Sequence, residues 1–300
     1  SFSIVRRHYM ELRSLRYFLA AAQEENMTKA AAVLHLTQPT LSRTLMELEH
    51  ELGKTLFIRS KKGLILTEAG RLLQHRAEEI LSLVDRTEGE MKKDQEISGD
   101  IYLAAGETDS LRDIAMMMSE LQQTYPRLRL RTNSGDTLFV LESHDKGLAD
   151  FGLVFEVLQD ERYKSLPIKK KERWGVLMKK DHPLAQKQSI CAEELMAYPI
   201  ILSEQSLRNG TMEKWFHKKL SDLSITGTYS LVNNGIKMAL GGMGCVLTYE
   251  ALSPLGSEIL VFRPLRPVLN EEAFLIWKKH RELSAPAKLF LEESKKRLTK

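Results

Sequence analysis

A pair of short helices near the N-terminus most strongly constrains what this chain can fold into. Thr28 is a good N-cap for a helix over residues 29–35, and Thr37 can cap a second helix with Pro39 in its first turn. Leucines then recur at spacings of four, three and four, at Leu41, Leu45, Leu48 and Leu52. This spacing makes one buried helical face, and Gly53 is a natural terminator after it. Two helices joined by so short a turn predict a helix-turn-helix.

The side chains outside the leucine stripe indicate a use for this motif. The start of the second helix presents Gln38, Thr40, Ser42 and Arg43 outward. In a recognition helix this part reaches base edges in the major groove, where Gln can pair with adenine and Arg with guanine. We therefore predict DNA contacts here, with Thr28 and Pro39 included in the contacting set. The alternative is a helix pair in any small bundle.

A basic turn follows the helices. Short apolar runs at residues 57–59 and 64–66 flank a turn of one serine, two lysines and one glycine, which predicts a β-hairpin wing. Arg59, Lys61 and Lys62 are placed to meet phosphates or a minor groove. The alternative is a charged turn that only faces solvent.

A long helix is predicted after the hairpin. Thr67 caps it, and Glu68 suits its first turn. A heptad seam runs through Leu73, Ala77, Ile80, Val84, Thr87 and Met91. Such a seam suits pairing with a second copy, so we predict a homodimer that faces two DNA half-sites. The alternative is an amphipathic helix packed against its own domain.

From about residue 100 the pattern changes to alternating strands and helices. Runs rich in Ile, Val, Leu and Phe predict strands at residues 100–106, 127–132, 149–155, 174–178, 199–202, 244–248 and 273–277. Helical patterns such as 111–125 and 211–220 lie between them. This alternation predicts an α/β domain with a mostly parallel sheet, beginning near Ile97 after a charged stretch.

Composition excludes several classes of protein. No window reaches the ~18 consecutive apolar residues of a membrane helix. The two cysteines provide neither a disulfide framework nor a zinc cluster, so we expect a cytoplasmic protein without a metal. The net charge of +4 is no evidence for DNA binding by the helical part, because residues 10–96 have a net charge of −1 and residues 97–300 have a net charge of +3. Because nucleophile-elbow, phosphate-loop, dinucleotide and zinc-protease motifs are absent, we expect no enzyme activity and no cofactor.

Residues 12–81 resemble the DNA-binding domain of the LysR-type transcriptional regulators. The match runs through residues 15–18, 28–31, 36–42, 48–49, 51–53, 56–59 and 66–70. Residues 101–106, 180–185 and 241–246 resemble segments of the family's effector domain, so the resemblance covers residues 10–300. Met27, Thr37 and Thr40 depart from the common Phe, Ser and Ala. Thr40 adds a hydroxyl to the reading face, which can alter the base preference of the recognition helix.

The resemblance implies a winged helix-turn-helix domain at residues 10–67, a linker and dimerisation helix at 68–96, and an effector-binding domain at 97–300. The effector domain is expected to have two α/β subdomains, like those of periplasmic solute-binding proteins. These are residues 97–166 with 265–300, and residues 167–264, with crossovers near 166–169 and 261–265. The implied function is a regulator that binds double-stranded promoter DNA as a homodimer or homotetramer and responds to a small molecule. The alternatives are an effector-independent DNA-binding protein and an enzyme that uses the cleft.

The position of the ligand follows from the α/β fold. Ligands of such sheets sit beyond the carboxyl ends of strands, at helix N-termini. This rule selects loops at residues 106–110, 155–157, 203–206, 230–234 and 248–249. The expected ligand contacts are Thr108, Ser110, Ser203, Asn233 and Thr248. Thr108 comes first because its position resembles a hydroxyl-bearing contact of the family. Each of these side chains could instead cap a helix or turn.

The charges in these loops indicate the kind of effector. Glu107 and Asp109 flank Thr108, and Glu204 follows Ser203. Small carboxylate ligands favour helix N-termini without carboxylates beside them. We therefore expect a neutral or amine-bearing effector, unless these acids point to solvent.

Overall fold

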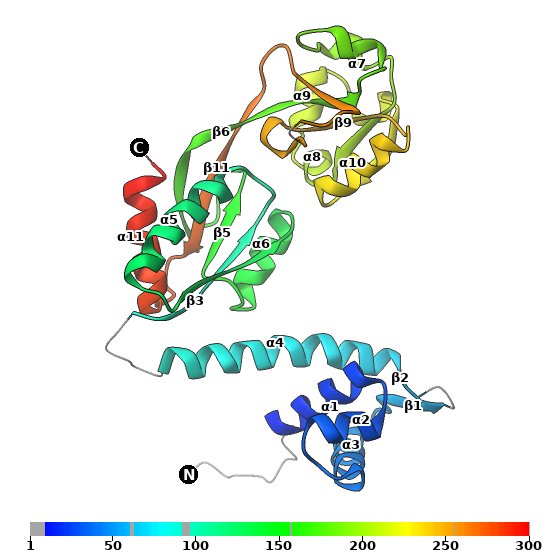
Figure 1. Ribbon diagram of the computed structural model, residues 1–300, viewed down its shortest axis with the longest axis vertical. Helices are drawn as coiled ribbons and strands as arrows, with labels where there is room; N and C mark the ends of the chain where they lie inside the picture. The colour runs from blue at the N-terminus through cyan, green and yellow to red at the C-terminus, as the bar shows by residue number, and fades with distance from the viewer. Residues whose placement is uncertain (1–9, 61–62, 92–96, 157, 255, 300) are drawn as a thin grey trace. The chain divides into compact units, whose positions relative to one another are not determined.

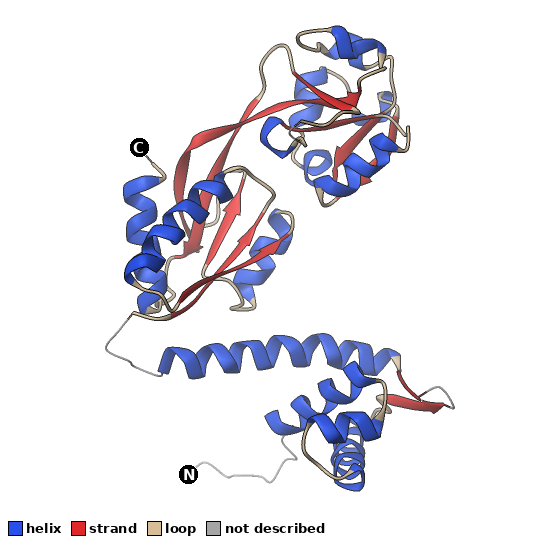
Figure 2. Ribbon diagram, viewed as in Figure 1, coloured by secondary structure: helices blue, strands red, loops and turns tan. Residues whose placement is uncertain are grey.

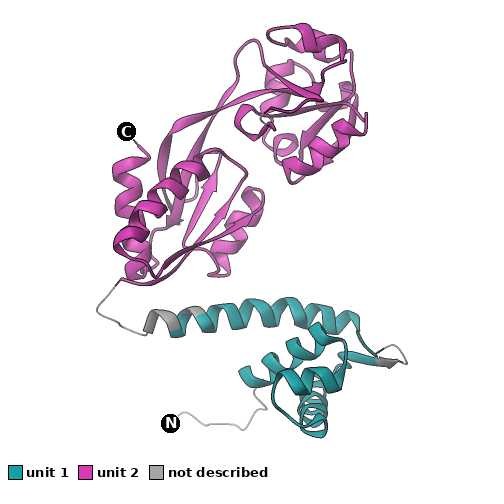
Figure 3. Ribbon diagram, viewed as in Figure 1, with its two compact units in different colours: residues 1–93 teal, residues 94–300 magenta. Residues whose placement is uncertain are grey.

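The computed structural model describes residues 10–60, 63–91, 97–156, 158–254 and 256–299. It divides the chain into two compact units, residues 1–93 and 94–300 (Figure 3). Each unit has a hydrophobic core of its own. Among the described residues, no helix is long and apolar enough to pass through a membrane.

The first unit is a helix-turn-helix followed by a hairpin and a long helix (Figure 1). Its elements are α1 (Leu12–Glu24), α2 (Met27–Val33), α3 (Gln38–Leu52), β1 (Phe57–Ser60), β2 (Gly63–Leu66) and α4 (Glu68–Met91). Phe18 of α1 lies at the centre of the core, fully buried, with its ring centroid 5.2 Å from that of Phe57. The helix-turn-helix, the wing and the long helix are therefore confirmed.

Three local details of this unit differ from the sequence interpretation. α2 begins at Met27, because the Asn26 side chain caps it by accepting the N–H groups of Thr28 and Lys29 at 2.9 and 3.0 Å. Thr28 is therefore not the cap. Thr37 does stand at the N-cap position of α3, but its hydroxyl pairs with that of Thr40 at 2.8 Å. Leu52 is 37% exposed, so the buried stripe ends at Leu48.

Among the described residues, the second unit contains a nine-stranded sheet flanked by helices (Figure 2). The strands are β3 (Gly99–Ala105), β4 (Leu128–Ser134), β5 (Phe151–Val154), β6 (Tyr163–Lys179), β7 (Ile200–Ser203), β8 (Ile225–Tyr229), β9 (Cys245–Tyr249), β10 (Leu260–Pro264) and β11 (Asn270–Lys278). The helices are α5 (Ser110–Thr124), α6 (Thr137–Asp145), α7 (Ala192–Leu195), α8 (Glu204–Arg208), α9 (Thr211–Phe216), α10 (Val232–Leu240) and α11 (Ala285–Arg297). We call β3–β5 with α5, α6 and α11 the first lobe, and β7–β10 with α7–α10 the second lobe.

The sheet is mixed, not mostly parallel. β3 pairs in parallel with β4 and β5, and β7 pairs in parallel with β8 and β9. The strands between these groups run the other way, because β6 is antiparallel to β9, β10 and β11, and β11 is antiparallel to β5. The prediction of a mostly parallel sheet is therefore wrong at its centre.

β6 and β10 explain the error. β6 is one strand that passes from lobe to lobe (Figure 1), where the sequence indicated a crossover near 166–169 and a separate strand at 174–178. The middle of β6 has three successive basic residues at 169–171, so it lacks the apolar pattern by which a strand is recognised in a sequence. Such a pattern is not needed there, because a segment between lobes has little apolar surface to bury. Residues 261–265 were expected to be a crossover, yet most of them belong to β10, which pairs with β6.

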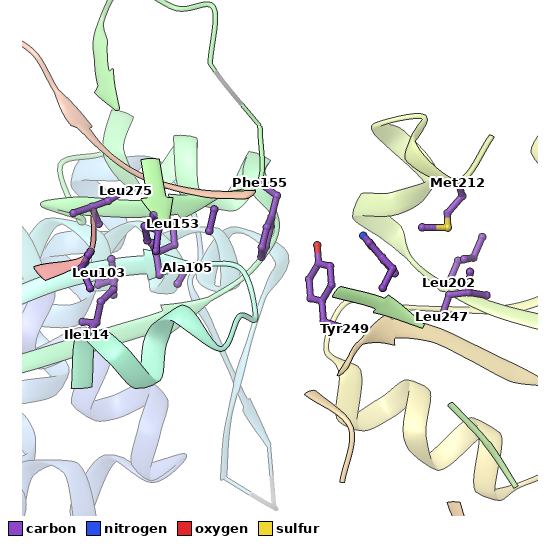
Figure 4. Close-up of a cluster of buried hydrophobic side chains, with 14 of the residues drawn as sticks. Leu103, Ala105, Ile114, Leu153, Phe155, Leu202, Met212, Leu247, Tyr249 and Leu275 are labelled. Atoms are coloured by element: carbon purple, nitrogen blue, oxygen red, sulfur yellow. The ribbon is translucent and has the colours of Figure 1, made fainter. Parts of the chain in front are cut away.

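The core of the second unit extends through both lobes (Figure 4). Leu103, Leu153 and Leu275 lie in its first-lobe part, and Leu202, Met212 and Leu247 lie in its second-lobe part. Phe155 and Tyr249 face each other where the two parts meet, with ring centroids 5.2 Å apart. These two rings also line the cleft described below.

Candidate functional sites

The start of α3 carries the predicted DNA contacts. Pro39 and Thr40 are exposed, Gln38 is half-buried, and Arg43 has 80% of its side chain exposed. Arg43 Nε donates to Glu47 Oε1 at 2.9 Å, one helical turn further along. Its two terminal nitrogens form no hydrogen bond with the described residues, so they are able to donate to a base or phosphate.

Ser42 does not belong to this exposed surface. It is buried, with 9% exposure, because it lies three residues before Leu45 and next to Leu41. The buried arc of α3 is therefore wider than the leucine stripe alone, and the prediction that Ser42 faces outward is wrong. Thr28 is exposed in the first turn of α2.

The wing is fixed at its base by contacts to α1 and α3. Glu49 Oε1 accepts the N–H groups of Leu56 and Phe57, at 2.6 and 3.2 Å, where β1 begins. At the start of β2, the Leu64 N–H donates to the Glu25 carbonyl at 2.8 Å. Gly63 has a φ of +125°, and a Cβ there would overlap the same carbonyl, so only glycine suits this position.

The wing tip is not described. Lys61 and Lys62 lie outside the described residues, as does the side chain of Arg59. The described part of the hairpin ends with Ser60 of β1 paired with Gly63 of β2.

α4 packs against its own unit along much of the expected seam. Thr67 caps the helix by accepting the Gly70 N–H at 2.9 Å. Ala77 is fully buried, and Leu73 and Ile80 are half-buried against the core of the first unit. Val84 is half-buried, and the side chain of Met91 lies outside the described residues. Leu72 and Leu83 are instead exposed, by 62% and 41%.

A cleft of about 590 Å³, open space at its mouth included, lies between the lobes of the second unit. It is lined by Gly106, Glu107, Gly135, Asp136, Phe155, Trp174, Ser203, Glu204, Gln205, Ser206, Asn209, Tyr229, Ser230, Thr248, Tyr249, Leu252 and Glu271. Four of these residues are acids, and none of the described lining residues is Lys, Arg or His. The lining therefore gives the cleft a negative electrostatic potential.

Two polar contacts cross from lobe to lobe beside the cleft. Glu107, after β3, accepts the Val232 N–H at the start of α10 at 2.5 Å. Asp136, which caps α6 by accepting the Phe139 N–H at 2.9 Å, also pairs with Arg208 at the end of α8. The carboxylates of the first lobe therefore hold the second lobe directly.

Thr108 faces a buried carboxylate. Glu172 of β6 accepts the Thr108 hydroxyl, and its Oε1 also accepts the Asp109 N–H at 2.9 Å, at the start of α5. Thr108 Oγ1 in turn accepts the Ser110 N–H at 3.0 Å. The position at this helix N-terminus that a ligand carboxylate would take is therefore filled by the protein's own carboxylate.

Aromatic rings form the other notable part of the lining. Trp174 and Tyr249 have ring centroids 4.6 Å apart, and both donate to Glu271 Oε2, at 2.9 and 2.6 Å. Burial raises the pKa of Glu271, and hydrogen bonds from Tyr249 and Trp174 oppose this rise. Burial also raises the pKa of Glu107, against the bond from Val232.

Two family profiles match this chain. The profile described as bacterial regulatory helix-turn-helix protein, lysR family, matches residues 12–71, and the LysR substrate binding domain matches residues 94–299. The chain belongs to the LysR family. It is therefore a transcriptional regulator with a helix-turn-helix DNA-binding domain and a substrate-binding domain.

Individual relatives match this chain over nearly its whole length. The HTH-type transcriptional regulator BudR of Raoultella terrigena is 30% identical over 94% of this chain and 99% of its own length. The uncharacterized regulator YvbU of Bacillus subtilis is 28% identical over 95% of this chain and 98% of its own length. The crystal structure of CbnR, a LysR family transcriptional regulator, covers 97% of this chain and 100% of its own, with a TM-score of 0.74 and 18% identity. CbnR has also been crystallised with its target DNA.

The five side chains expected to contact the ligand do not all lie in the cleft. Ser203 and Thr248 line the cleft. Thr108 and Ser110 are buried behind it, and the Ser110 hydroxyl has no hydrogen-bond partner among the described residues. Asn233 is exposed and does not line the cleft. The acids beside Thr108 also differ, since Glu107 lines the cleft while Asp109 pairs with Arg112 and Lys170.

Sequence reasoning missed three residues of the cleft lining and one buried carboxylate beside the cleft. Asp136 follows the carboxyl end of β4, so the loop rule that selected the other segments also applies to it. Trp174, Glu172 and Glu271 stand on the long strands β6 and β11. No local pattern marks them, because their place beside the cleft depends on how these strands pass between the lobes.

Proposed function

We propose that this LysR-family protein binds promoter DNA in the cytoplasm through α3 and the wing, and responds to a small molecule held between the lobes. The observation that carries this proposal is one chain with both an exposed recognition-helix start and an open, lined cleft. The CbnR complex with DNA supports the same use of the motif. The open cleft favours this function over an effector-independent DNA-binding protein, and we propose no catalytic activity.

The proposed division of labour follows the sequence. Residues 10–67 bind DNA, residues 68–96 join two copies into a dimer that can form a tetramer, and residues 97–300 bind the effector. Within the cleft, we assign effector contacts to Ser203 and Thr248, which line it. Thr108 acts indirectly by fixing Glu172.

Base reading by Arg43 is tested by substitution. We expect Arg43→Ala to weaken binding to the specific site by ~1–3 kcal/mol if the guanidinium pairs with guanine. Glu47→Gln is the matched variant, because it releases Arg43 and removes a negative charge beside the DNA. It should bind DNA at least as tightly as the natural chain. Fluorescence anisotropy with the gene's upstream DNA and a shuffled duplex measures both, and an equal loss for Arg43→Ala on the two duplexes would disprove base reading.

The wing lysines are expected to contact phosphates. Replacing Lys61 and Lys62 with alanine should weaken binding to the specific and shuffled duplexes alike. It should also reduce the slope of log affinity against log salt by about 1 for each lysine, because each contact releases a counterion. Anisotropy titrations at four salt concentrations measure the slope. An unchanged slope would mean that the tip only faces solvent.

The dimer is expected to use the exposed side of α4. Leu72 and Leu83 are eleven residues apart, about three helical turns, so they share one face. We expect Leu72→Glu combined with Leu83→Glu to give monomers with unchanged helix content. Ile80→Asp should instead destabilise the first unit, because Ile80 packs against its core. Sedimentation velocity and circular dichroism separate the two effects, and a double variant of unchanged mass would exclude this face.

A further inference from the structure

We propose that the effector is a small organic cation, an amine with an apolar body, held between the aromatic rings and the carboxylates of the cleft. The inference rests on the proposed function, because it names the chemical class of the ligand that this cleft binds. Three features support it. The lining is acidic, the helix N-termini beside the cleft are already capped by carboxylates of the chain, and a cluster of aromatic residues donates hydrogen bonds to Glu271.

The lining has more negative charge than its own cations neutralise. Of its four acids, only Asp136 forms an ion pair with a described residue, Arg208. Glu107, Glu204 and Glu271 form none within the described part of the chain. An anionic ligand would therefore meet repulsion, whereas a cation supplies the missing counter-charge.

The helix N-termini that could bind an anion are already occupied. Glu172 accepts the N–H at the start of α5, Asp136 accepts one at the start of α6, and Glu107 accepts one at the start of α10. Because each of these helices is capped by a carboxylate of the chain itself, a ligand carboxylate has to displace one of them to reach the helix N–H groups.

The aromatic cluster provides positive evidence for a cation. The rings of Phe155, Tyr249 and Trp174 contact one another in sequence. The Trp174 indole N–H and the Tyr249 hydroxyl both donate to Glu271. Ring faces attract ammonium groups, most strongly where water is displaced. Burial raises the pKa of Glu271 by disfavouring its charged form, and a bound ammonium group beside it would favour that form.

Matched probes test the charge preference on the full-length protein. Three series share a body and differ in charge: benzylamine, benzyl alcohol and benzoate; choline, 3,3-dimethylbutanol and 3,3-dimethylbutyrate; cadaverine, 1,5-pentanediol and glutarate. Trp174 in the lining gives a fluorescence signal, and calorimetry gives the affinity. We expect the cation of at least one series to bind about tenfold more tightly than its neutral and anionic counterparts. Binding led by an anion, or no preference for a cation in any series, would overturn the inference.

Charge-neutral variants place the binding in the cleft. Glu204→Gln, at an exposed position of the lining, should weaken binding of the preferred cation severalfold and leave its neutral analogue unaffected; Glu271→Gln should do so more strongly. Glu258→Gln removes the same charge from an exposed position outside the lining and should change neither. If Glu204→Gln and a folded Glu271→Gln both bind the cation like the natural chain, the cleft is not its site.

The same samples are tested for binding to the upstream DNA. A protein that binds this DNA but none of the cations would reject this inference and leave the proposed DNA-binding function intact.

Discussion

Phe18→Ala should remove about 3–5 kcal/mol from the folding free energy of the DNA-binding unit. Phe18 is fully buried at the centre of that unit's core and packs against Phe57 of the wing. A loss of this size is a large fraction of the ~5–15 kcal/mol that stabilises a typical domain. We therefore expect specific DNA binding to be lost near physiological temperature.

The effector unit should remain folded in the same variant, because the two units have separate cores. The three tryptophans of the chain, Trp174, Trp215 and Trp277, all belong to the second unit. Tryptophan fluorescence should therefore give an unchanged unfolding curve, while far-UV circular dichroism shows early loss of helix. Leu12→Ala, at an exposed position of the same helix, is the control and should change neither curve. A parallel shift of the fluorescence curve would show that the units unfold together.

The first unit could be predicted in most of its parts because its signals are local. The leucine spacing of α3, the cap at Thr67 and the turn around Gly63 each lie within one short window of sequence. The two errors have different causes. At the start of α2, two neighbouring residues can each act as the cap, and Asn26 does so in place of Thr28. The burial of Ser42 depends on tertiary packing, that is, on how widely α1 and α2 cover α3.

The cleft could be predicted only where it is built from loops after strands. Glu107, Ser203 and Thr248 follow from that rule, and they do line the cleft. Glu172 and Glu271 do not follow from it, because nothing in the local sequence shows that a charged residue in a long strand is buried. The expectation that Thr108 contacts the ligand overlooked Glu172, which is 64 residues away in sequence and takes the Thr108 hydroxyl.

Glu172→Ala should destabilise the effector unit by about 3 kcal/mol, because it leaves the buried Thr108 hydroxyl and the half-buried Asp109 N–H without an acceptor. Glu172→Gln should cost less, since its amide oxygen still accepts one of these bonds. Glu272→Ala is the control on the neighbouring strand β11, where Glu272 is less buried. Tryptophan fluorescence during thermal unfolding measures all three.

The alanine variant also tests why the cleft should reject anions. Without Glu172, the N-terminus of α5 offers free N–H groups and a positive helix end, which together form an anion site. Acetate should therefore stabilise Glu172→Ala by up to ~2.7 kcal/mol at 100 times its dissociation constant and leave the natural chain unchanged at equal ionic strength. Equal stabilisation of both proteins would mean that acetate binds elsewhere. A selective effect would show that this regulator's own carboxylate occupies the place of a ligand carboxylate, so that its effector has to be recognised by other chemistry.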